Sequence, residues 1–229
     1  MDYVVLCAGR GQRMMPLTKH QPKCMIKING KSFIHHILDV IKEFDPDGRV
    51  IIITGYLQDV LYKHCRVKEG YKIYKHQPIC NGTANAIYCV KDIVKDDFIV
   101  ISGDTWISKE QLQLLKSTSN SLIYSIRIHN LESYGTLDIN NNEIVRINEK
   151  ETNPTTNLVN GGLYHFTQDI FKYIERTEYD KRFNEKIITN SINNLIRDGI
   201  KFYGLKVDEL LEANTVKDIK KLEEHLNGK

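Results

Sequence analysis

Short apolar segments alternate three times with segments of helical periodicity along the first half of the chain. The apolar segments are rich in valine and isoleucine, which is typical of strands in the interior of a sheet. Strands are expected at residues 4–8, 49–54, 71–74 and 98–102, and helices at residues 33–44, 57–65 and 84–94. This alternation predicts an α/β fold, because consecutive strands joined by helices form a largely parallel sheet that helices cover.

After Gly103 the pattern changes to strands connected by shorter turns. Asn140, Asn141 and Asn142 are a tight-turn signal between two strands and predict a β-hairpin. Strands are expected at residues 121–128, 135–139, 143–148, 158–166 and 201–206, and helices at residues 168–176, 184–197 and 216–226. The sequence shows no linker or internal repeat. A single domain over residues 1–229 with a small β-rich lobe is therefore the simplest organisation.

Composition excludes several classes of function. A net charge of +3 without a long Lys/Arg run argues against a dedicated nucleic-acid binder. No apolar run approaches the roughly 20 residues of a membrane helix, and the N-terminus does not follow the pattern of a signal peptide. The five cysteines form no C-x-x-C pair, so we expect a reduced, cytoplasmic protein rather than a disulfide framework or a zinc site.

Gly9 and Gly11 follow the first predicted strand, where glycines let the backbone approach a ligand and expose consecutive N–H groups to an anion. A dinucleotide-binding fingerprint would require a third glycine where Met14 stands. A P-loop ending at residues 30–32 would require its first glycine where Met25 stands. Neither standard motif applies, and the two glycines alone fit an ordinary strand-to-helix turn.

Two cations in the same loop, Arg13 and Lys23, make a triphosphate a better-fitting ligand than the glycines alone would indicate. The run LCAGRGQRMMPLT at residues 6–18 is followed by PKCM at 22–25 and NGK at 29–31. This ordered series closely resembles the signature of sugar-phosphate nucleotidylyltransferases.

The resemblance extends from Val4 to Leu226. It implies a Rossmann-like nucleotide-diphospho-sugar transferase fold, with a mostly parallel mixed sheet, helices on both faces and a small β-rich sugar-binding lobe. Residues 1–120 would mainly bind the nucleotide, and residues 121–229 would mainly bind the sugar phosphate.

The resemblance also assigns residues to the nucleotide. Arg13 would neutralise the phosphates, and Lys23 would contact the phosphates around the reacting centre. Gln77 would read uracil or thymine with an amide that both donates and accepts, which favours UTP or dTTP. The expected nucleotide-binding set is Leu6, Ala8, Gly9, Gly11, Arg13, Lys23, Gln77, Gly82 and Thr83.

Asp104 follows a predicted strand, where a carboxylate points into the crevice at the sheet edge. The family holds Mg²⁺ at this aspartate and at a second carboxylate, so we expect Mg²⁺ on Asp104 and Glu212. Glu212 stands where the family usually has aspartate, and Asn214 where it usually has glycine. Asp104 also completes the expected catalytic set with Arg13 and Lys23. The expected sugar-phosphate-binding set is Tyr134, Gly135, Glu149, Lys150 and Asn160.

These expectations describe an enzyme that joins a nucleoside triphosphate to a sugar 1-phosphate and releases pyrophosphate. Its partners would be these substrates, with neither nucleic acid nor membrane, and the resemblance allows a homodimer or homotetramer. One alternative is the same chemistry with CTP or GTP and another sugar phosphate or a small phosphate ester such as phosphocholine. The others are a glycosyltransferase and a nucleotide-binding sensor without catalysis. A glycosyltransferase would need an Asp-x-Asp-like motif, which residues 103–105 do not supply.

Overall fold

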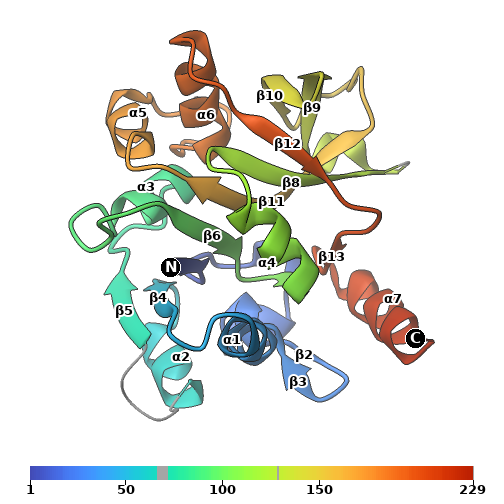
Figure 1. The fold of residues 1–229 in the computed structure, drawn as a ribbon. Coiled ribbons are helices and arrows are strands. Elements are labelled where there is room, and N and C mark those ends of the chain that lie inside the picture. Colours follow the sequence, from blue (N-terminus) through green and yellow to red (C-terminus); the bar gives the residue numbers. More distant parts are fainter. Residues whose placement is uncertain (66–71, 128, 229) are drawn as a thin grey trace.

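The computed structural model describes residues 1–65, 72–127 and 129–228, and a nine-stranded sheet forms its centre (Figure 1). The strands lie in the order β5-β4-β1-β6-β11-β8-β12-β10-β9. Their bounds are β1 (Asp2–Leu6), β4 (Arg49–Thr54), β5 (Lys72–His76), β6 (Phe98–Ser102), β8 (Ser121–Ile126), β9 (Gly135–Asn140), β10 (Glu143–Glu149), β11 (Leu158–Phe166) and β12 (Tyr203–Lys206). Two short pairs stand apart from this sheet: β2 (Lys27–Ile28) with β3 (Lys31–Ser32), and β7 (Thr105–Trp106) with β13 (Leu211–Glu212).

The first four strands of this order, from β5 to β6, are parallel. Val4 of β1 faces Ile51 on one side and Val100 on the other, and all three side chains are buried. Leu6 pairs with Ser102, so the carboxyl ends of β1 and β6 lie at one edge of the sheet. In open α/β sheets this edge is where ligands bind.

The rest of the sheet is mainly antiparallel. β11 runs antiparallel to both β6 and β8, β9 and β10 form a hairpin, and β12 lies parallel to β8. In the hairpin turn, Asn141 and Asn142 have φ angles of 49° and 67°, a left-handed conformation that asparagine tolerates. The expected mixed α/β sheet is therefore confirmed, and the β-rich part continues the same sheet.

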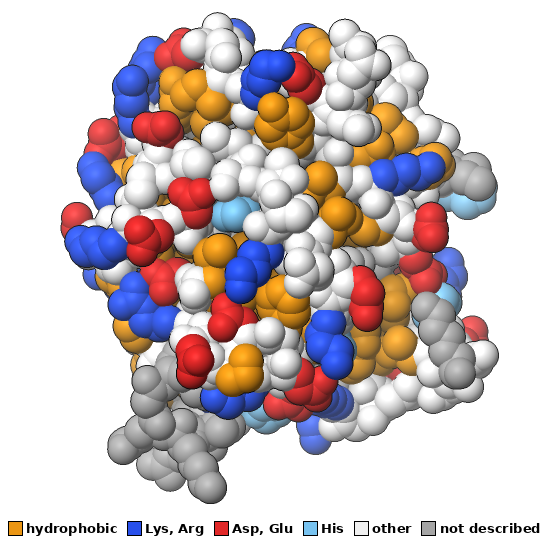
Figure 2. Space-filling view, viewed as in Figure 1, with side chains coloured by type: hydrophobic (Ala, Val, Ile, Leu, Met, Phe, Trp, Pro, Cys, Tyr) orange, Lys and Arg blue, Asp and Glu red, His pale blue; other side chains and the backbone are white. Residues whose placement is uncertain are grey.

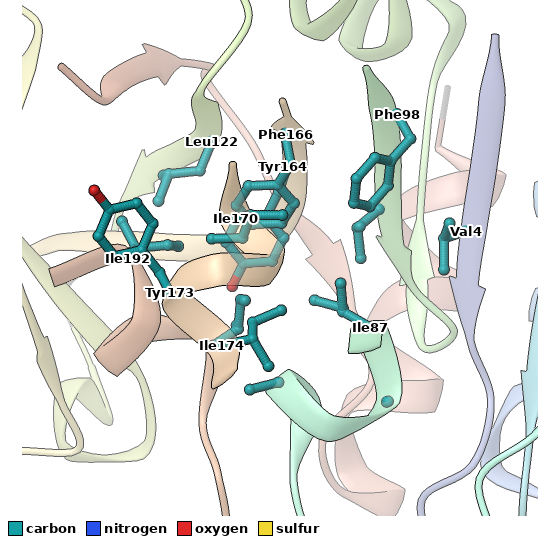
Figure 3. Close-up of a cluster of buried hydrophobic side chains, with 14 of the residues drawn as sticks. Val4, Ile87, Phe98, Leu122, Tyr164, Phe166, Ile170, Tyr173, Ile174 and Ile192 are labelled. Atoms are coloured by element: carbon teal, nitrogen blue, oxygen red, sulfur yellow. The ribbon is translucent and has the colours of Figure 1, made fainter. Parts of the chain in front are cut away.

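Helices cover both faces of the sheet. Val4 packs into a cluster with α3, α5 and α6, whereas Tyr3 and Val5 pack into a second cluster with α1, α2 and α4, as the alternation of side chains along a strand requires. In the first cluster the stacked rings of Tyr164 and Phe166 lie beside Phe98 (Figure 3). The helices are α1 (Phe33–Phe44), α2 (Gln58–His64), α3 (Thr83–Tyr88), α4 (Lys109–Lys116), α5 (Ile170–Arg176), α6 (Ile188–Arg197) and α7 (Val216–Asn227).

Several helix bounds differ from those expected. α3 ends at Tyr88 rather than near residue 94, and turns follow it. α6 begins at Ile188 rather than 184, because Asp180 and Glu185 pair in an isolated β-bridge before it. α4 was not expected, although a capping box of Ser108 with Gln111 marks its start. Parts of the strands expected at 71–74 and 121–128 fall on residues 71 and 128, which lie outside the described residues.

Charged side chains of both signs are interspersed over the face of the molecule in Figure 2, and apolar side chains lie in small separate groups. On this face the described Lys and Arg side chains do not gather into one continuous band. In the described part of the chain, none of the helices has both the length and the apolar character to cross a membrane.

Candidate active site

A cleft of about 900 Å³ opens at the carboxyl edge of the parallel strands. The loop after β1 forms one wall and is anchored by two backbone hydrogen bonds, Cys7 N–H to Ile53 O at 2.9 Å and Gly103 N–H to Leu6 O at 3.1 Å. Gly11 has a φ of +60°, and a Cβ there would lie 3.0 Å from Thr18 Cγ2, so this turn of the loop favours glycine.

The cleft brings together residues that are far apart in the sequence. It is lined by every residue of the expected nucleotide-binding set, and by Asp104 and Lys150 as well. Glu212 and the remaining members of the sugar-phosphate-binding set are not among its lining residues. The nucleotide-binding residues thus share one surface, and their binding roles stay predictions.

Lys23 and Asp104 form an ion pair within the cleft, between side chains that are 15% and 26% exposed. Asn214 Oδ1 accepts hydrogen bonds from Arg13 Nη2 at 3.0 Å and from Lys23 Nζ at 3.4 Å, and Asn214 Nδ2 donates to Tyr134 Oη at 3.2 Å. Asn214 therefore links Arg13 and Lys23, the two cations expected to bind phosphate, to Tyr134 of the expected sugar-phosphate-binding set.

The start of α7 fixes the position of Asn214. The Asp218 carboxylate accepts hydrogen bonds from the backbone N–H groups of Asn214 at 3.0 Å and Thr215 at 2.7 Å. Thr215 and Asp218 form a capping box, the usual arrangement that satisfies the free N–H groups at a helix start. These hydrogen bonds hold the backbone at Asn214 and Thr215, and the Asn214 side chain lines the cleft.

Asp104 and Glu212 are neighbours, because β7 pairs with β13 and places Thr105 opposite Glu212. Burial, and then the charge of Asp104, raise the pKa of Glu212 above its ordinary value. Glu212 Oε1 accepts a hydrogen bond from Arg127 Nη2 at 3.0 Å, and the Arg127 guanidinium stacks 4.4 Å from the centre of the Tyr134 ring. Glu212, expected to bind the metal, is thus paired with Arg127, which offsets only part of the effect of burial and of Asp104 on its pKa.

The donor set at Asp104 and Glu212 fits Mg²⁺ in part. Among the described residues, no group of three or more His, Cys, Asp or Glu side chains lies close enough to hold a metal ion. Mg²⁺ is commonly held by one or two carboxylates together with substrate phosphates, however, and Asp104 and Glu212 supply two neighbouring carboxylates.

Gly135, Glu149 and Asn160 come together beside the cleft. A Cβ on Gly135 would lie 3.1 Å from Glu149 Oε2 and 3.7 Å from Asn160 Cβ, so a side chain there would crowd the Glu149 carboxylate. Glu149 Oε2 accepts from Thr189 Oγ1 at 3.0 Å, and Asn160 Nδ2 donates to Tyr164 Oη at 2.7 Å. These hydrogen bonds orient two groups that could recognise hydroxyls.

Lys150 reaches the cleft from the end of β10. Its φ angle is 48°, in the left-handed region, and its backbone N–H donates to Tyr134 O at 3.0 Å. Its ammonium lies 4.6 Å from the centre of the Phe183 ring, whose other neighbour is the Arg182 guanidinium at 4.9 Å. Contact with an aromatic ring orients Lys150 without neutralising its charge.

Gln77 and Gly82 form the side of the cleft expected to face the base. Gln77 is 4% exposed, and its Nε2 donates to Gly82 O at 3.2 Å and to Asn81 Oδ1 at 3.3 Å. Gly82 has a φ of +115°, and a Cβ there would lie 2.1 Å from Lys186 O. Gly82 is therefore required by the close approach of the Lys186 backbone, whatever its role toward a base.

Three further residues lie at the candidate site but were not expected from the sequence: Asn214, Arg127 and Glu185. Asn214 and Glu185 line the cleft, and Arg127 donates a hydrogen bond to Glu212. The departure from the family pattern at Asn214 was a signal, since a polar side chain replaces a glycine beside the second expected metal ligand. Arg127 and Glu185 lie in no recognised motif, and only the folded structure brings them to the site.

The fold and the cleft together define an α/β protein in which the cations Arg13, Lys23 and Lys150 and the carboxylate of Asp104 gather at the edge of the sheet. Residues 3–210 match the model of the nucleotidyl transferase family. The chain belongs to this family.

Curated relatives agree with this membership. The chain is 33% identical over 224 residues to the bifunctional protein GlmU of Methanocaldococcus jannaschii, covering 93% of this chain and 53% of that protein. It is 29% identical to the UTP–glucose-1-phosphate uridylyltransferase AglF of Haloferax volcanii, covering 91% of this chain and 88% of that protein. The chain spans about half the length of the GlmU proteins that it matches.

Solved structures share the fold. A UDP-glucose pyrophosphorylase complexed with UDP-glucose superposes with a TM-score of 0.87 at 21% identity, covering 99% of this chain and 98% of that chain. A putative glucose-1-phosphate thymidylyltransferase from Bacillus anthracis superposes with a TM-score of 0.81 at 22% identity, covering 98% of this chain and 94% of that chain.

Proposed function

We propose that the protein transfers a nucleotidyl group from UTP or dTTP to a sugar 1-phosphate and releases pyrophosphate. The observation that carries the proposal is the shared cleft, which Arg13, Lys23, Asp104 and Lys150 all line. Two polyanions repel each other, so an enzyme that joins them needs cations fixed on both sides of the reacting phosphorus. The name of AglF, whose length the chain nearly matches, supports a uridylyl group and a sugar phosphate.

The reaction needs positioning more than proton transfer. A phosphate monoester has a second pKa near ~6, so the sugar phosphate is largely ionised at neutral pH and requires no general base. Its oxygen attacks the α-phosphorus in line and forms a new P–O bond. The bond from the α-phosphorus to the bridging oxygen breaks, and the leaving pyrophosphate takes that electron pair.

Each cation has a place in this scheme. Arg13 and the N–H groups of the glycine loop hold the outer phosphates, Lys23 holds the α-phosphate, and Lys150 holds the sugar phosphate. Asn214 keeps Arg13 and Lys23 a fixed distance apart through its two accepted hydrogen bonds. Asp104 and Glu212 would hold Mg²⁺, which when bound neutralises phosphate charge.

Pyrophosphate release over a grid of nucleoside triphosphates and sugar 1-phosphates tests the proposal. We expect turnover with UTP or dTTP and at least one sugar 1-phosphate, and none when either substrate is omitted. Phosphocholine with CTP belongs in the grid, because turnover there alone would establish the alternative acceptor class. Binding of nucleotide without turnover for any pair would overturn the proposal and leave a nucleotide sensor.

A further inference from the structure

Two cysteine side chains meet on the floor of the cleft. Cys7 directly follows β1, Cys24 directly follows Lys23, and both line the cleft. The two residues are 5% and 3% exposed. A Cβ on Gly103 would lie 2.9 Å from Cys7 Sγ and 3.3 Å from Cys24 Cβ, so both side chains lie against the same point beside Asp104.

The other thiols near the cleft are placed differently. Cys80 also lines the cleft, but its Sγ donates to Ala8 O at 3.0 Å. Cys65 is 1% exposed and is not among the lining residues. Cys7 and Cys24 are therefore the two thiols that both line the cleft and lie against the same point at Gly103. Hydrogen bonding to Cys24, and then burial, raise the pKa of Cys7 well above its ordinary value, so reaction at neutral pH should be slow.

We propose that Cys7 and Cys24 are an oxidisable pair, which a peroxide entering the cleft converts to a disulfide that inactivates the site. One sulfur attacks a peroxide oxygen, the O–O bond breaks, and a sulfenic acid and water form. The second sulfur then attacks the sulfenic sulfur, forms the S–S bond and expels a second water. Two thiols are oxidised and one peroxide is reduced to two waters.

Inactivation follows from the position of Lys23. An S–S bond of about 2.05 Å is much shorter than any non-bonded contact between two sulfur atoms, so closing it must reorient the two side chains and draw together the segments that carry them. Lys23 is the adjacent residue, and its ammonium is held by Asp104 and Asn214. A displacement of about 1 Å at a positioning group can cost about 10²-fold in rate.

Peptide mapping after peroxide treatment tests the pair directly. Tryptic cleavage separates the cysteines, with Cys7 in peptide 1–10, Cys24 in 24–27, Cys65 in 64–66, and Cys80 and Cys89 in 76–91. With free thiols alkylated before digestion, we expect peptides 1–10 and 24–27 to be linked, and to separate on treatment with dithiothreitol. A link through Cys65 or Cys80, or no link, would overturn the proposal.

Pyrophosphate release provides the second measurement, and it rests on the proposed function. Oxidised wild-type protein should lose at least about 10-fold of its rate and regain it with dithiothreitol. Cys24→Ala should show the same rate before and after peroxide, while the control Cys65→Ala should respond as the wild type does. A linked protein with an unchanged rate would refute the inactivation. A reduced protein without any transfer would count against the proposed function, and the mapping would still decide the pair.

Discussion

Arg127 Nη2 lies 3.0 Å from Glu212 Oε1, in a pair whose side chains are only 29% and 15% exposed. Removing the arginine leaves a carboxylate without its cation next to Asp104. Arg127→Ala should therefore lower the free energy of unfolding by about 2 kcal/mol, measured by urea denaturation. The matched control is Arg176→Ala, which breaks the more exposed pair with Asp198 and should cost at most about 0.5 kcal/mol. Equal losses of unfolding free energy in the two variants would show that the less exposed pair stabilises the protein no more than the exposed one.

Asp104→Ala should abolish pyrophosphate release at saturating magnesium, because it removes a carboxylate proposed to hold the cation and the partner of Lys23. Asp208→Ala is the control, since Asp208 is an exposed carboxylate on the segment that leads to Glu212. Chelation of divalent cations should give the same loss in the wild type. If Asp104→Ala turned over at the wild-type rate, the assignment of the metal to this residue would be wrong.

Lys150→Ala should raise the KM for the sugar 1-phosphate by about 10-fold or more and leave the KM for the nucleotide nearly unchanged, because the lysine is proposed to contact only the acceptor. Steady-state kinetics with each substrate varied in turn will separate the two constants. Lys181→Ala removes an exposed lysine nearby and should change neither. A rise confined to the nucleotide KM would show that Lys150 acts on the nucleotide rather than on the sugar 1-phosphate.

Asn214→Gly restores the residue usual in the family and removes the hydrogen bonds to Arg13 and Lys23. Loss of a hydrogen bond to a charged group is worth about 1.5 kcal/mol or more, so we expect the KM for the nucleotide to rise about 10-fold. Asn214→Asp keeps an acceptor oxygen and should retain a lower KM than the glycine variant. The same KM in all three proteins would mean that Asn214 does not position these cations.

Side-chain hydrogen bonds from Arg182 lower the pKa of Asp180 to about 2. In the unfolded chain an aspartate titrates near ~3.9, so the native protein binds fewer protons between these values. The stability contributed by the pair is thus present above about pH 4 and is lost as the pH falls toward 2. Asp180→Asn should flatten the fall of Tm across this window in circular dichroism melts, whereas Asp208→Asn should not. If Tm fell equally steeply with pH in Asp180→Asn and in the wild type, Asp180 would not be the source of this pH dependence.

Local sequence patterns predicted the bounds of a helix or strand correctly where its apolar periodicity matches the residues that the fold buries. The helix expected at 33–44 and the strand expected at 49–54 have those bounds in the structure, because their apolar residues face the core at helical spacing or along a buried strand. The glycine loop, Gln77 and Asp104 each follow a strand whose carboxyl end lies at one edge, so the topology alone brings them to one cleft.

Contacts between segments far apart in the sequence could not be predicted from local sequence patterns. Arg127 reaches Glu212 across 85 positions of the chain, and Asn214 reaches Arg13 across 201. Neither contact has a local pattern, because each depends on the pairing of β13 with β7 and on where α7 begins. The left-handed backbone of Lys150 was equally unforeseen, since lysine rarely adopts it and the tertiary hydrogen bond to Tyr134 imposes it.

One nine-stranded sheet runs from β5 to β9, and its strands carry residues of both the expected nucleotide-binding set and the expected sugar-phosphate-binding set. Apart from β10 and β12, which pair at Glu143 and Tyr203, neighbouring strands cannot separate without breaking several hydrogen bonds at once, so the sheet should hold the proposed nucleotide and acceptor sites at a constant spacing. Adaptation to a new acceptor would then come from exchanges of side chains at the rim, as at Asn160 or Glu185. Engineering of acceptor choice can accordingly leave the β-sheet untouched.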